Sequence, residues 1–515
     1  MSTSALTNID SSIDDAKEQI LSAYANALSG VRPDHYVKQR PDGPYLVIEF
    51  AAPSEHHYGV HNSIAAELAE ENPLKGRSTV QRRKKAAANR LALPETQMLK
   101  KVIAESLTID KNSFNEDFFS RYTASVTGLE QQVTTRANFV VYGRRGSGKS
   151  SLLAYAMHTA RQSKNLYCWI AMQTFAKRAD LEVVPAVLAG ILDELKQSLI
   201  STIELDELMV AFETLSEATD KAVLGKCDRL IPRLRRVIGK LVNASSPLTI
   251  FLDDIHVLDE TVQPLVLSYI YKITRGNNIY IKASGIAQLT KLWDSAQQIG
   301  LQAPHDTQIL NLDLNLTMPD KSKTHIESIL DAHAGYCGLP NIRYLIGEDA
   351  FSRLVLCAAG VPRDSLSLFS IAISKAVAKS QKLVSITSIN AAASEMVEEK
   401  IKDIERDSGS DLQSIQSTLA DVKKFCVLTH RKNSFLVEMR NSNATYKLIQ
   451  KLIALRLVHL LHEGITPHEA GKRFIALMLD YGFYVGIRAA RSVDFIPSEP
   501  KQLSAKELRS LPIFH

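Results

Sequence analysis

Three glycines, a lysine and a serine are spaced in this chain as the binding of a polyphosphate requires. Residues 137–150 read ANFVVYGRRGSGKS, and the segment from Gly143 to Ser150 satisfies the pattern G-x-x-x-x-G-K-[ST] in full. Only 23 of the 515 residues are glycine, so this cluster is informative. Backbone N–H groups can turn onto phosphates where no Cβ intervenes, and the loop therefore predicts a nucleotide site.

Each position of the loop has an expected role. Lys149 is expected to act in catalysis by binding the β and γ phosphates of ATP, and the Ser150 hydroxyl is expected to be a Mg²⁺ ligand. The alternative is an ordinary glycine-rich turn between a strand and a helix. The predicted nucleotide-binding residues of the loop are Gly143, Arg144, Arg145, Gly146, Ser147, Gly148, Lys149, Ser150 and Ser151.

Two neighbouring aspartates supply the carboxylates that such a site also needs. They end the apolar run in PLTIFLDDIH, residues 247–256. We expect Asp253 to hold Mg²⁺ directly or through water, and Asp254 to orient or deprotonate the attacking water. The alternative is a pair of acidic residues that precede and cap the next helix.

These side chains require a parallel sheet whose carboxyl edge carries them. Residues 139–142 predict a buried strand that leads into the loop, and residues 150–158 predict the helix that follows it. The run before Asp253 suits a central strand, residues 278–284 alternate like another, and residues 308–316 would close the sheet. The predicted fold class is α/β.

GRRGSGKSSLL, FLDDIH and GVPRD follow one another in this order. Together they resemble the motifs of P-loop ATPases of the AAA+ and STAND group, and in particular the bacterial and archaeal ATPases that are similar to origin-recognition initiators. The resemblance runs over most of residues 115–490. It implies an N-terminal extension or partner-docking region (1–110), a P-loop core with a parallel sheet (111–319), a helical lid (320–410) and a C-terminal winged-helix-like domain (411–515).

The resemblance also implies residues that sense the nucleotide. Ser284 ends its predicted strand where relatives place the γ-phosphate sensor, with Asn278 as a second candidate; an ordinary serine at a strand end is the alternative. In GVPRD, residues 360–364, local chemistry predicts a helix ended by Gly360 and a new one capped by Asp364. Relatives of the AAA+ type use an arginine here, so Arg363 is a predicted catalytic contact. STAND relatives present the turn itself, so Pro362 is a predicted nucleotide contact.

One expected element is missing. AAA+ machines that hydrolyse ATP across a subunit interface carry an arginine finger between the sensor strand and the lid, yet residues 276–342 contain no arginine. Such a finger raises the rate of hydrolysis by roughly 10³- to 10⁵-fold, so its absence favours slow hydrolysis and a role as a switch. The pair Asp253–Asp254, in place of the Asp-Glu pair usual in hydrolysing AAA+ proteins, points the same way. Other arginines could take the place of the finger, or they could simply belong to a solvated helix face or end. They are Arg275, Arg229, Arg233, Arg235 and Arg236.

Basic charge is concentrated in the last fifth of the chain. The net charge is +5, but residues 411–515 alone carry 15 Lys and Arg against nine Asp and Glu, or +6. Residues 445–457 predict a helix with Lys447, Lys451 and Arg456 projecting from it, and residues 458–462 and 474–485 predict a hairpin. This order suits a winged helix that binds double-stranded DNA, with Lys472 and Arg473 on phosphates. The alternative is a domain that binds protein.

The N-terminal region, the cysteines and the absence of long apolar runs complete the sequence-based expectations. An acidic helix (12–28), a short strand (45–50) and a basic stretch (75–90) are the readable features of the N-terminal region. The basic stretch is expected to be a solvated helix or linker, and the alternative is a contact for nucleic acid or a partner-docking arm. The five cysteines have no metal-binding spacing and predict reduced core residues. The chain shows neither a signal peptide nor an apolar run that would span a membrane, so we expect no membrane partner and a cytoplasmic protein.

Together these features predict an ATPase that binds ATP and Mg²⁺, hydrolyses ATP slowly and acts as a switch. The switch would control DNA binding and assembly, either into a homo-oligomer or with a partner protein. The alternative function is a STAND-like signalling or antiviral defence ATPase whose terminal regions bind protein partners.

Overall fold

The computed structural model describes residues 3–84, 87–198, 202–218, 222–242, 246–313, 316–407, 412–440, 443–466, 472–484 and 493–515. The chain forms two compact units. The P-loop unit is Ala124–Leu314, and the flanking unit combines Met1–Thr123 with Asn315–His515. The four regions expected from the sequence stay a prediction. The flanking unit combines most of three of them, the N-terminal region, the lid and the C-terminal region.

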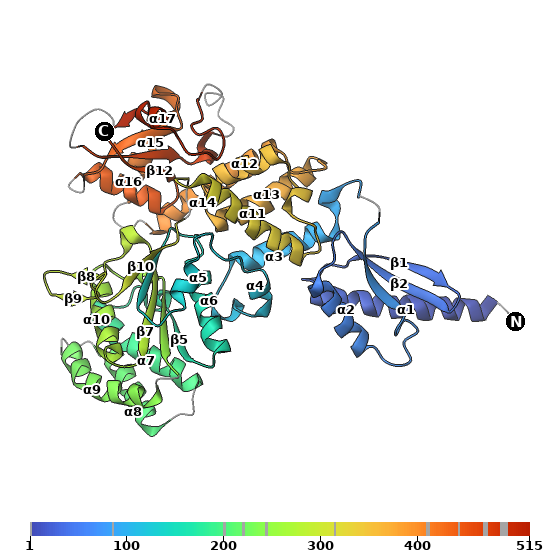
Figure 1. Ribbon diagram of the computed structural model, residues 1–515, viewed down its shortest axis with the longest axis horizontal. Helices are drawn as coiled ribbons and strands as arrows, with labels where there is room; N and C mark the ends of the chain where they lie inside the picture. Colours follow the sequence, from blue (N-terminus) through green and yellow to red (C-terminus); the bar gives the residue numbers. More distant parts are fainter. Residues whose placement is uncertain are drawn as a thin grey trace. The chain divides into compact units, whose positions relative to one another are not determined.

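The P-loop unit is built on a five-stranded parallel sheet in the order β10-β4-β7-β6-β5 (Figure 1). Its strands are β4 (Phe139–Tyr142), β5 (Leu166–Ala171), β6 (Leu248–Asp253), β7 (Ile279–Gly285) and β10 (Gln308–Asn311). A two-stranded hairpin follows β7, formed by β8 (Trp293–Asp294) and β9 (Ile299–Gly300). The expected strand at residues 308–316 is shorter than predicted, and residues 314–315 lie outside the described residues.

Helices cover both faces of this sheet. They are α5 (Leu129–Val133), α6 (Lys149–Gln162), α7 (Asp180–Ser198), α8 (Ile203–Ser216), α9 (Val223–Leu241) and α10 (Val262–Thr274). One face of the sheet, including Val140, Ile250 and Ile281, shares a buried core with α7 to α10, while α6 packs on the other face. Burial on both sides is why the central strands are almost continuous apolar runs.

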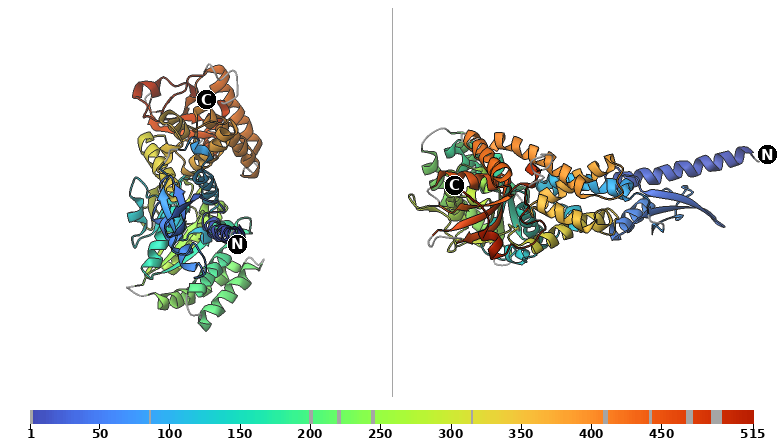
Figure 2. Two further views of the ribbon diagram at one scale, coloured as in Figure 1. Left: turned by 90° about the vertical axis from the view of Figure 1, so that its right-hand side faces the viewer. Right: turned by 90° about the horizontal axis from the view of Figure 1, so that it is seen from above.

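The flanking unit begins with a small α/β layer. It contains α1 (Thr3–Ala27), β1 (Asp34–Arg40), β2 (Gly43–Phe50), α2 (Glu55–Glu67), β3 (Ser78–Arg82), α3 (Pro94–Leu107) and α4 (Glu116–Ser120). Strand β2 is central, antiparallel to β1 and parallel to β3. Helix α1 runs along these strands, as Figures 1 and 2 show, and its Ile20 and Tyr24 share a core with Leu46 of β2.

Four helices form the middle of the flanking unit. They are α11 (Pro319–Tyr336), α12 (Glu348–Cys357), α13 (Pro362–Ala378) and α14 (Ile386–Asp407). Helix α3 packs against α11 and α13, so residues from far apart in the sequence share one core. The expected capping role of Asp364 is wrong. Helix α13 begins at Pro362 after Val361, and Asp364 is 2% exposed and faces the interior.

The C-terminal part of the flanking unit is a four-stranded mixed sheet with helices. Its elements are α15 (Leu412–Lys424), a π-helical turn (Phe425–Thr429), β11 (Ser434–Glu438), α16 (Ala444–Ala454), β12 (Val458–Ile465), β13 (Phe474–Leu479), α17 (Ala505–Arg509) and β14 (Ile513–Phe514). The strand order is β12-β13-β11-β14. The helix and hairpin expected from the sequence are present as α16, β12 and β13.

Two details of that hairpin differ from the expectation. The second strand ends at Leu479, because a 3₁₀ turn follows at Tyr481–Tyr484. Val485, the last residue of the expected second strand, and residues 467–471, which connect the two strands, lie outside the described residues. Arg456 does not project from α16. It follows the helix with a φ of 61° and binds the buried carboxylate of Asp364.

A buried ionic cluster joins the middle helices to the C-terminal sheet. Lys400 of α14 lies 3.2 Å from an Asp364 carboxylate oxygen and 2.8 Å from Asp480, which follows β13. His459 of β12 lies 2.9 Å from the same oxygen of Asp480, and Arg456 binds Asp364. Burial opposes charge on Lys400 and Asp480, but the surrounding opposite charges raise the pKa of Lys400 and lower that of Asp480. These five side chains are called the ionic cluster below.

The cysteines and the helices also bear on two expectations about the whole chain. All five cysteines are free and buried, as expected for core residues. Among the residues that the structure describes, no helix has both the length and the apolar character needed to cross a membrane.

Candidate nucleotide site

The loop after β4 is shaped by its glycines. Gly146 and Gly148 have φ angles of 82° and 98°, in the region that side chains with a Cβ rarely adopt. A Cβ on Gly143 would lie only 2.3 Å from the Ser147 hydroxyl. That hydroxyl is buried and makes no hydrogen bond within the described part of the chain. The loop is therefore a narrow backbone cradle with an unsatisfied polar group inside it.

Lys149 is the first residue of α6 and lies directly after this loop. Its ammonium group is almost fully buried, donates to the Arg144 carbonyl oxygen at 3.3 Å and lies 3.8 Å from Asp254 Oδ1. Burial lowers the pKa of Lys149, although the carboxylates of Asp254 and Asp253 oppose that shift. An amine at a helix N-terminus, beside the free N–H groups of the first turn, is suited to bind an anion.

Two hydroxyls converge on a single carboxylate oxygen beside the loop. Ser150 donates to Asp253 Oδ1 at 3.0 Å, and Ser284 donates to the same oxygen at 2.7 Å. Ser284 also accepts a hydrogen bond from the Asp254 backbone N–H at 2.7 Å. The three residues come from α6 and from the carboxyl ends of β6 and β7, which meet at one edge of the sheet.

The pKa of Asp253 is raised to about 6. Burial is the main cause, and the neighbouring Asp254 carboxylate adds to it, while the hydrogen bonds from Ser284 and Ser150 oppose the rise. A carboxylate that is costly to keep charged in this position gains from a nearby cation. Hard oxygen ligands such as the Ser150 hydroxyl and this carboxylate suit Mg²⁺.

Asp254 has a different environment. Its backbone is left-handed, with a φ of 59°, and its side chain is 40% exposed between Lys149 and His256. The Asp254 Oδ1 to His256 Nδ1 distance is 3.7 Å. A half-exposed carboxylate beside the phosphate cradle can reach a water molecule there more readily than Asp253, whose Oδ1 already accepts hydrogen bonds from two hydroxyls.

This geometry fits a nucleotide and its cation. The cradle leaves no room for a Cβ at Gly143, the Ser147 hydroxyl has no hydrogen-bond partner among the residues that the structure describes, and the lysine ammonium lies against the loop. Residues 124–280 match the family of AAA ATPase domains. These residues form an AAA ATPase domain. A domain of this family implies a nucleoside triphosphatase that binds a nucleotide.

Similar solved structures cover more of the chain. Drosophila ORC bound to DNA is 14% identical, with 82% of this chain and 96% of that chain covered at a TM-score of 0.35. The Aeropyrum pernix ORC1 protein in complex with DNA is 15% identical, with coverages of 67% and 83% at 0.36. A Walker-type ATPase of Pyrococcus abyssi is 11% identical, with coverages of 73% and 98% at 0.41. The sequence matches none of the curated proteins with which it was compared.

The structure brings most of the predicted site residues of the AAA ATPase domain together, with some differences. Lys149, Ser150, Asp253, Asp254 and Ser284 converge as described. Asn278 precedes β7, about 20 Å along the strand from Ser284, so it lies at the wrong edge of the sheet for a γ-phosphate sensor. Ser284 is fully buried against the two aspartates, an arrangement that positions them; its role as a sensor stays a prediction.

The other predicted nucleotide contacts have different environments. Arg144 is buried and donates from Nε to Asp313 at 2.7 Å, a partner that sequence reasoning missed because 168 residues separate the two. Arg145 and Ser151 are half-buried in the loop and the first turn of α6. Pro362 and Arg363 open α13 in the flanking unit, so their contact with nucleotide stays a prediction.

Replacing Asp254 with asparagine should slow ATP hydrolysis by about a hundredfold or more, because the amide cannot accept a proton from water. Asparagine tolerates the left-handed backbone at this position, so the loop should be retained. Turnover and ATP affinity are measured on the same protein, and affinity should change by less than about tenfold. Asp259→Asn, at an exposed carboxylate on the same segment, is the control. Unchanged turnover in Asp254→Asn would contradict the assignment.

Proposed function

We propose that this chain is a slow, ATP-driven switch whose nucleotide state controls assembly and the binding of double-stranded DNA by its C-terminal region. The observation that carries the proposal is the convergence of Lys149, Ser150, Asp253 and Asp254 on the glycine cradle. Mg²⁺ supplies charge neutralisation for the phosphates when bound. Ser150 and Asp253 would hold it, Lys149 would bind the β and γ phosphates, and Asp254 would orient or deprotonate the attacking water.

Slow turnover is inferred from what surrounds this site. Asp254 lies 3.8 Å from the Lys149 ammonium, so the proposed base is paired with the lysine until phosphates attract that lysine away. The chain also lacks an arginine between residues 276 and 342, where a finger would be expected. A domain that binds ATP well and hydrolyses it slowly keeps one conformation for as long as the nucleotide stays bound.

DNA binding is proposed for the C-terminal region because of its charge and element order. Helix α16 carries the exposed Lys447, and the hairpin begins its second strand beside the exposed Lys472 and Arg473. Of the five basic residues that the sequence assigns to this contact, Arg456 is engaged in the ionic cluster, while Lys447, Lys472 and Arg473 are exposed and Lys451 is half-buried. A helix followed by a hairpin can place the helix in a major groove and the hairpin on the backbone.

The proposal is tested by measuring the mass of the protein in solution with and without ATP, and with and without duplex DNA. A switch predicts a larger assembly with ATP and a further complex with the duplex. Assembly with ATP but without any DNA affinity would instead support the STAND-like alternative, in which the terminal regions bind protein. A mass that is the same under all four conditions would contradict both functions.

The DNA contact itself is tested by its salt dependence. Each lost phosphate contact to duplex DNA should lower the slope of log affinity against log salt by about 0.9. Lys447→Gln, Lys472→Gln and Arg473→Gln should each produce such a change, while Lys375→Gln on α13 should not. An affinity that does not fall with salt would exclude the C-terminal basic residues as the main contact.

A further inference from the structure

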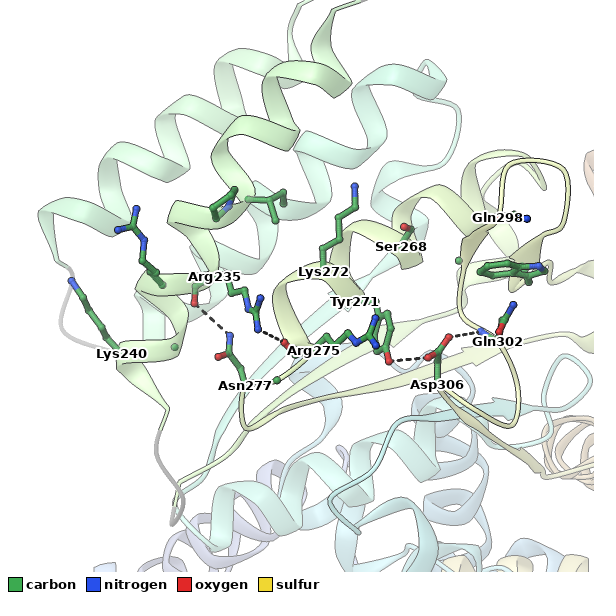
Figure 3. Close-up of a pocket in the computed structure, with 17 residues that line it drawn as sticks. Arg235, Lys240, Ser268, Tyr271, Lys272, Arg275, Asn277, Gln298, Gln302 and Asp306 are labelled. Carbon is green, nitrogen blue, oxygen red and sulfur yellow. Dashed lines mark hydrogen bonds between the residues drawn. The ribbon is translucent and has the colours of Figure 1, made fainter.

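The P-loop unit contains a second polar groove, about 1430 Å³ in volume, that the proposed function does not use. It lies between α9, the end of α10 and the hairpin β8–β9 (Figure 3). Gly276 and Asn277, which line it, come immediately before β7, and Asp306 comes just before β10. The groove therefore lies at the amino ends of these strands, whereas the nucleotide cradle lies at the carboxyl ends.

Five basic side chains line one half of this groove: Arg235, Arg236, Lys240, Lys272 and Arg275. All five are exposed. Lys240 pairs with Glu204 at 3.1 Å and Lys272 pairs with Asp228 at 2.8 Å. Within the described part of the chain, none of the three arginines forms an ion pair. A concave surface with three unneutralised guanidinium groups attracts phosphates, which arginine binds in bidentate fashion.

The guanidinium of Arg235 is held in place by a hydrogen bond that uses one of its donors. Arg235 Nη2 donates to the Arg275 carbonyl oxygen at 2.7 Å, at the end of α10. Gly276 makes room for this contact, since a Cβ there would lie 2.9 Å from the same Nη2. Asn277 donates to the carbonyl oxygens of Ile273 and Arg235, which ties the turn to both helices. A guanidinium has five N–H donors, so four on Arg235 stay available to a ligand.

The other half of the groove is different in chemistry. It is lined by Trp293, Gln298 and Gln302 from the hairpin segment and by Tyr271. Asp306, the carboxylate between the two halves, accepts hydrogen bonds from the Tyr271 hydroxyl at 2.8 Å and from the Gln302 backbone at 3.0 Å. Figure 3 shows this row running from Lys240 and Arg235 past Arg275 and Tyr271 to Gln302. A ligand here would meet cations at one end and an aromatic ring with amides at the other.

We propose that this groove binds a segment of single-stranded nucleic acid, with its phosphates on Arg235, Arg236 and Arg275 and an unstacked base on Trp293. Phosphates alone would use only the basic half, whereas a single strand offers both an anionic backbone and exposed base faces. A duplex keeps its bases stacked and would leave the aromatic half unused. The inference does not depend on ATP binding or hydrolysis, and it concerns a surface separate from the C-terminal basic residues.

The test measures the affinity of the full chain for a labelled oligothymidine over a series of salt concentrations. The double variant Arg235→Gln/Arg275→Gln should lower the slope of log affinity against log salt by about 1.4, at about 0.7 per phosphate contact to a single strand. Trp293→Ala should weaken binding roughly tenfold through lost stacking. In a Trp169→Phe background, where Trp293 is the one remaining tryptophan, the oligonucleotide should quench its fluorescence.

Matched variants separate this site from the other two. Arg161→Gln/Lys164→Gln removes two exposed charges elsewhere on the P-loop unit and should leave oligothymidine binding unchanged. Lys472→Gln/Arg473→Gln should weaken duplex binding without changing the single-strand slope, so failure of the proposed DNA switch is seen independently. Three outcomes would overturn the proposal. The variant Arg235→Gln/Arg275→Gln could lose duplex and single-strand binding equally, or it could show slower ATP turnover with unchanged oligonucleotide affinity. The third is tight binding of inorganic tripolyphosphate together with no effect of Trp293→Ala on oligonucleotide binding.

Discussion

Replacing Lys149 with alanine should lower the affinity for ATP by about a hundredfold or more. The lysine ammonium lies against the glycine cradle, at 3.3 Å from the Arg144 carbonyl oxygen, and no other amine comes from α6 at this point. Hydrogen bonds to charged groups contribute about 1.5–3 kcal/mol each, and bonds to both the β and the γ phosphate would be lost. The affinity is measured by titration with a fluorescent ATP analogue and confirmed by calorimetry.

Two controls make this result specific. Arg161→Ala removes a cation from the exposed last turn of the same helix and should leave the affinity unchanged. Loss of Lys149 also leaves Asp253 and Asp254 without their nearby cation, so the fold of the variant must be verified. Both tryptophans, Trp169 and Trp293, belong to the P-loop unit, and their fluorescence reports its unfolding. A folded Lys149→Ala protein with wild-type affinity would refute the nucleotide site.

Replacing Lys400 with methionine should lower the free energy of unfolding of the flanking unit by about 3–5 kcal/mol. Lys400 is 6% exposed and lies between the carboxylates of Asp364 and Asp480. Removing one member of a buried ionic network leaves its partners charged and desolvated, which is far costlier than breaking an exposed pair. The methionine side chain is similar in length to that of lysine. The change in the free energy of unfolding therefore reflects the lost charge more than a cavity.

The matched control is Lys375→Met. Lys375 pairs with Glu395 between α13 and α14, but both side chains are more than a third exposed, so the cost should stay below about 1 kcal/mol. Tryptophan fluorescence cannot follow this unit, because it contains no tryptophan; far-ultraviolet circular dichroism and amide hydrogen exchange are the suitable probes. Equal stability loss in the two variants would mean that the ionic cluster does not hold the C-terminal sheet to the middle helices.

The convergence of the main residues of the candidate nucleotide site could be predicted from the sequence because each of them belongs to a local pattern. Asp253 and Ser284 lie at the carboxyl ends of their strands, and Lys149 and Ser150 follow the short loop after β4; parallel strands bring these ends to one edge of the sheet. Pairing of distant residues could not be predicted in this way. No sequence pattern near Arg144 predicts its ion pair with Asp313. Likewise, no pattern near Ser284 predicts that its hydroxyl donates a hydrogen bond to Asp253.

Local rules also misjudged residues whose partners lie far along the chain. Asp364 has the sequence position of a helix cap, and Arg456 has the spacing of an exposed helical residue. In the structure the two bind each other across 92 positions, and Lys400 joins them. Burying an unpaired charge is costly, so charged groups in the interior pair with one another. This pairing outweighs the local preference of Asp364 for capping a helix and of Arg456 for solvent. The inner strand β11 and the edge strand β14 could not be predicted because both are short and pair with strands that are distant in the sequence.

The interrupted order of the flanking unit has a consequence for how the protein is made. Leu99 and Val102 of α3 are fully buried in a core completed by residues from α11 onward. At about 5–20 residues per second, synthesis of the intervening P-loop unit delays that completion by roughly 10 to 40 s. Throughout this interval the nascent chain lacks the α11 and α13 side chains that pack against α3 in the folded protein. Destabilising changes in α11 or α13 should therefore reduce the yield of native protein through aggregation during translation, even where the ATPase domain folds normally.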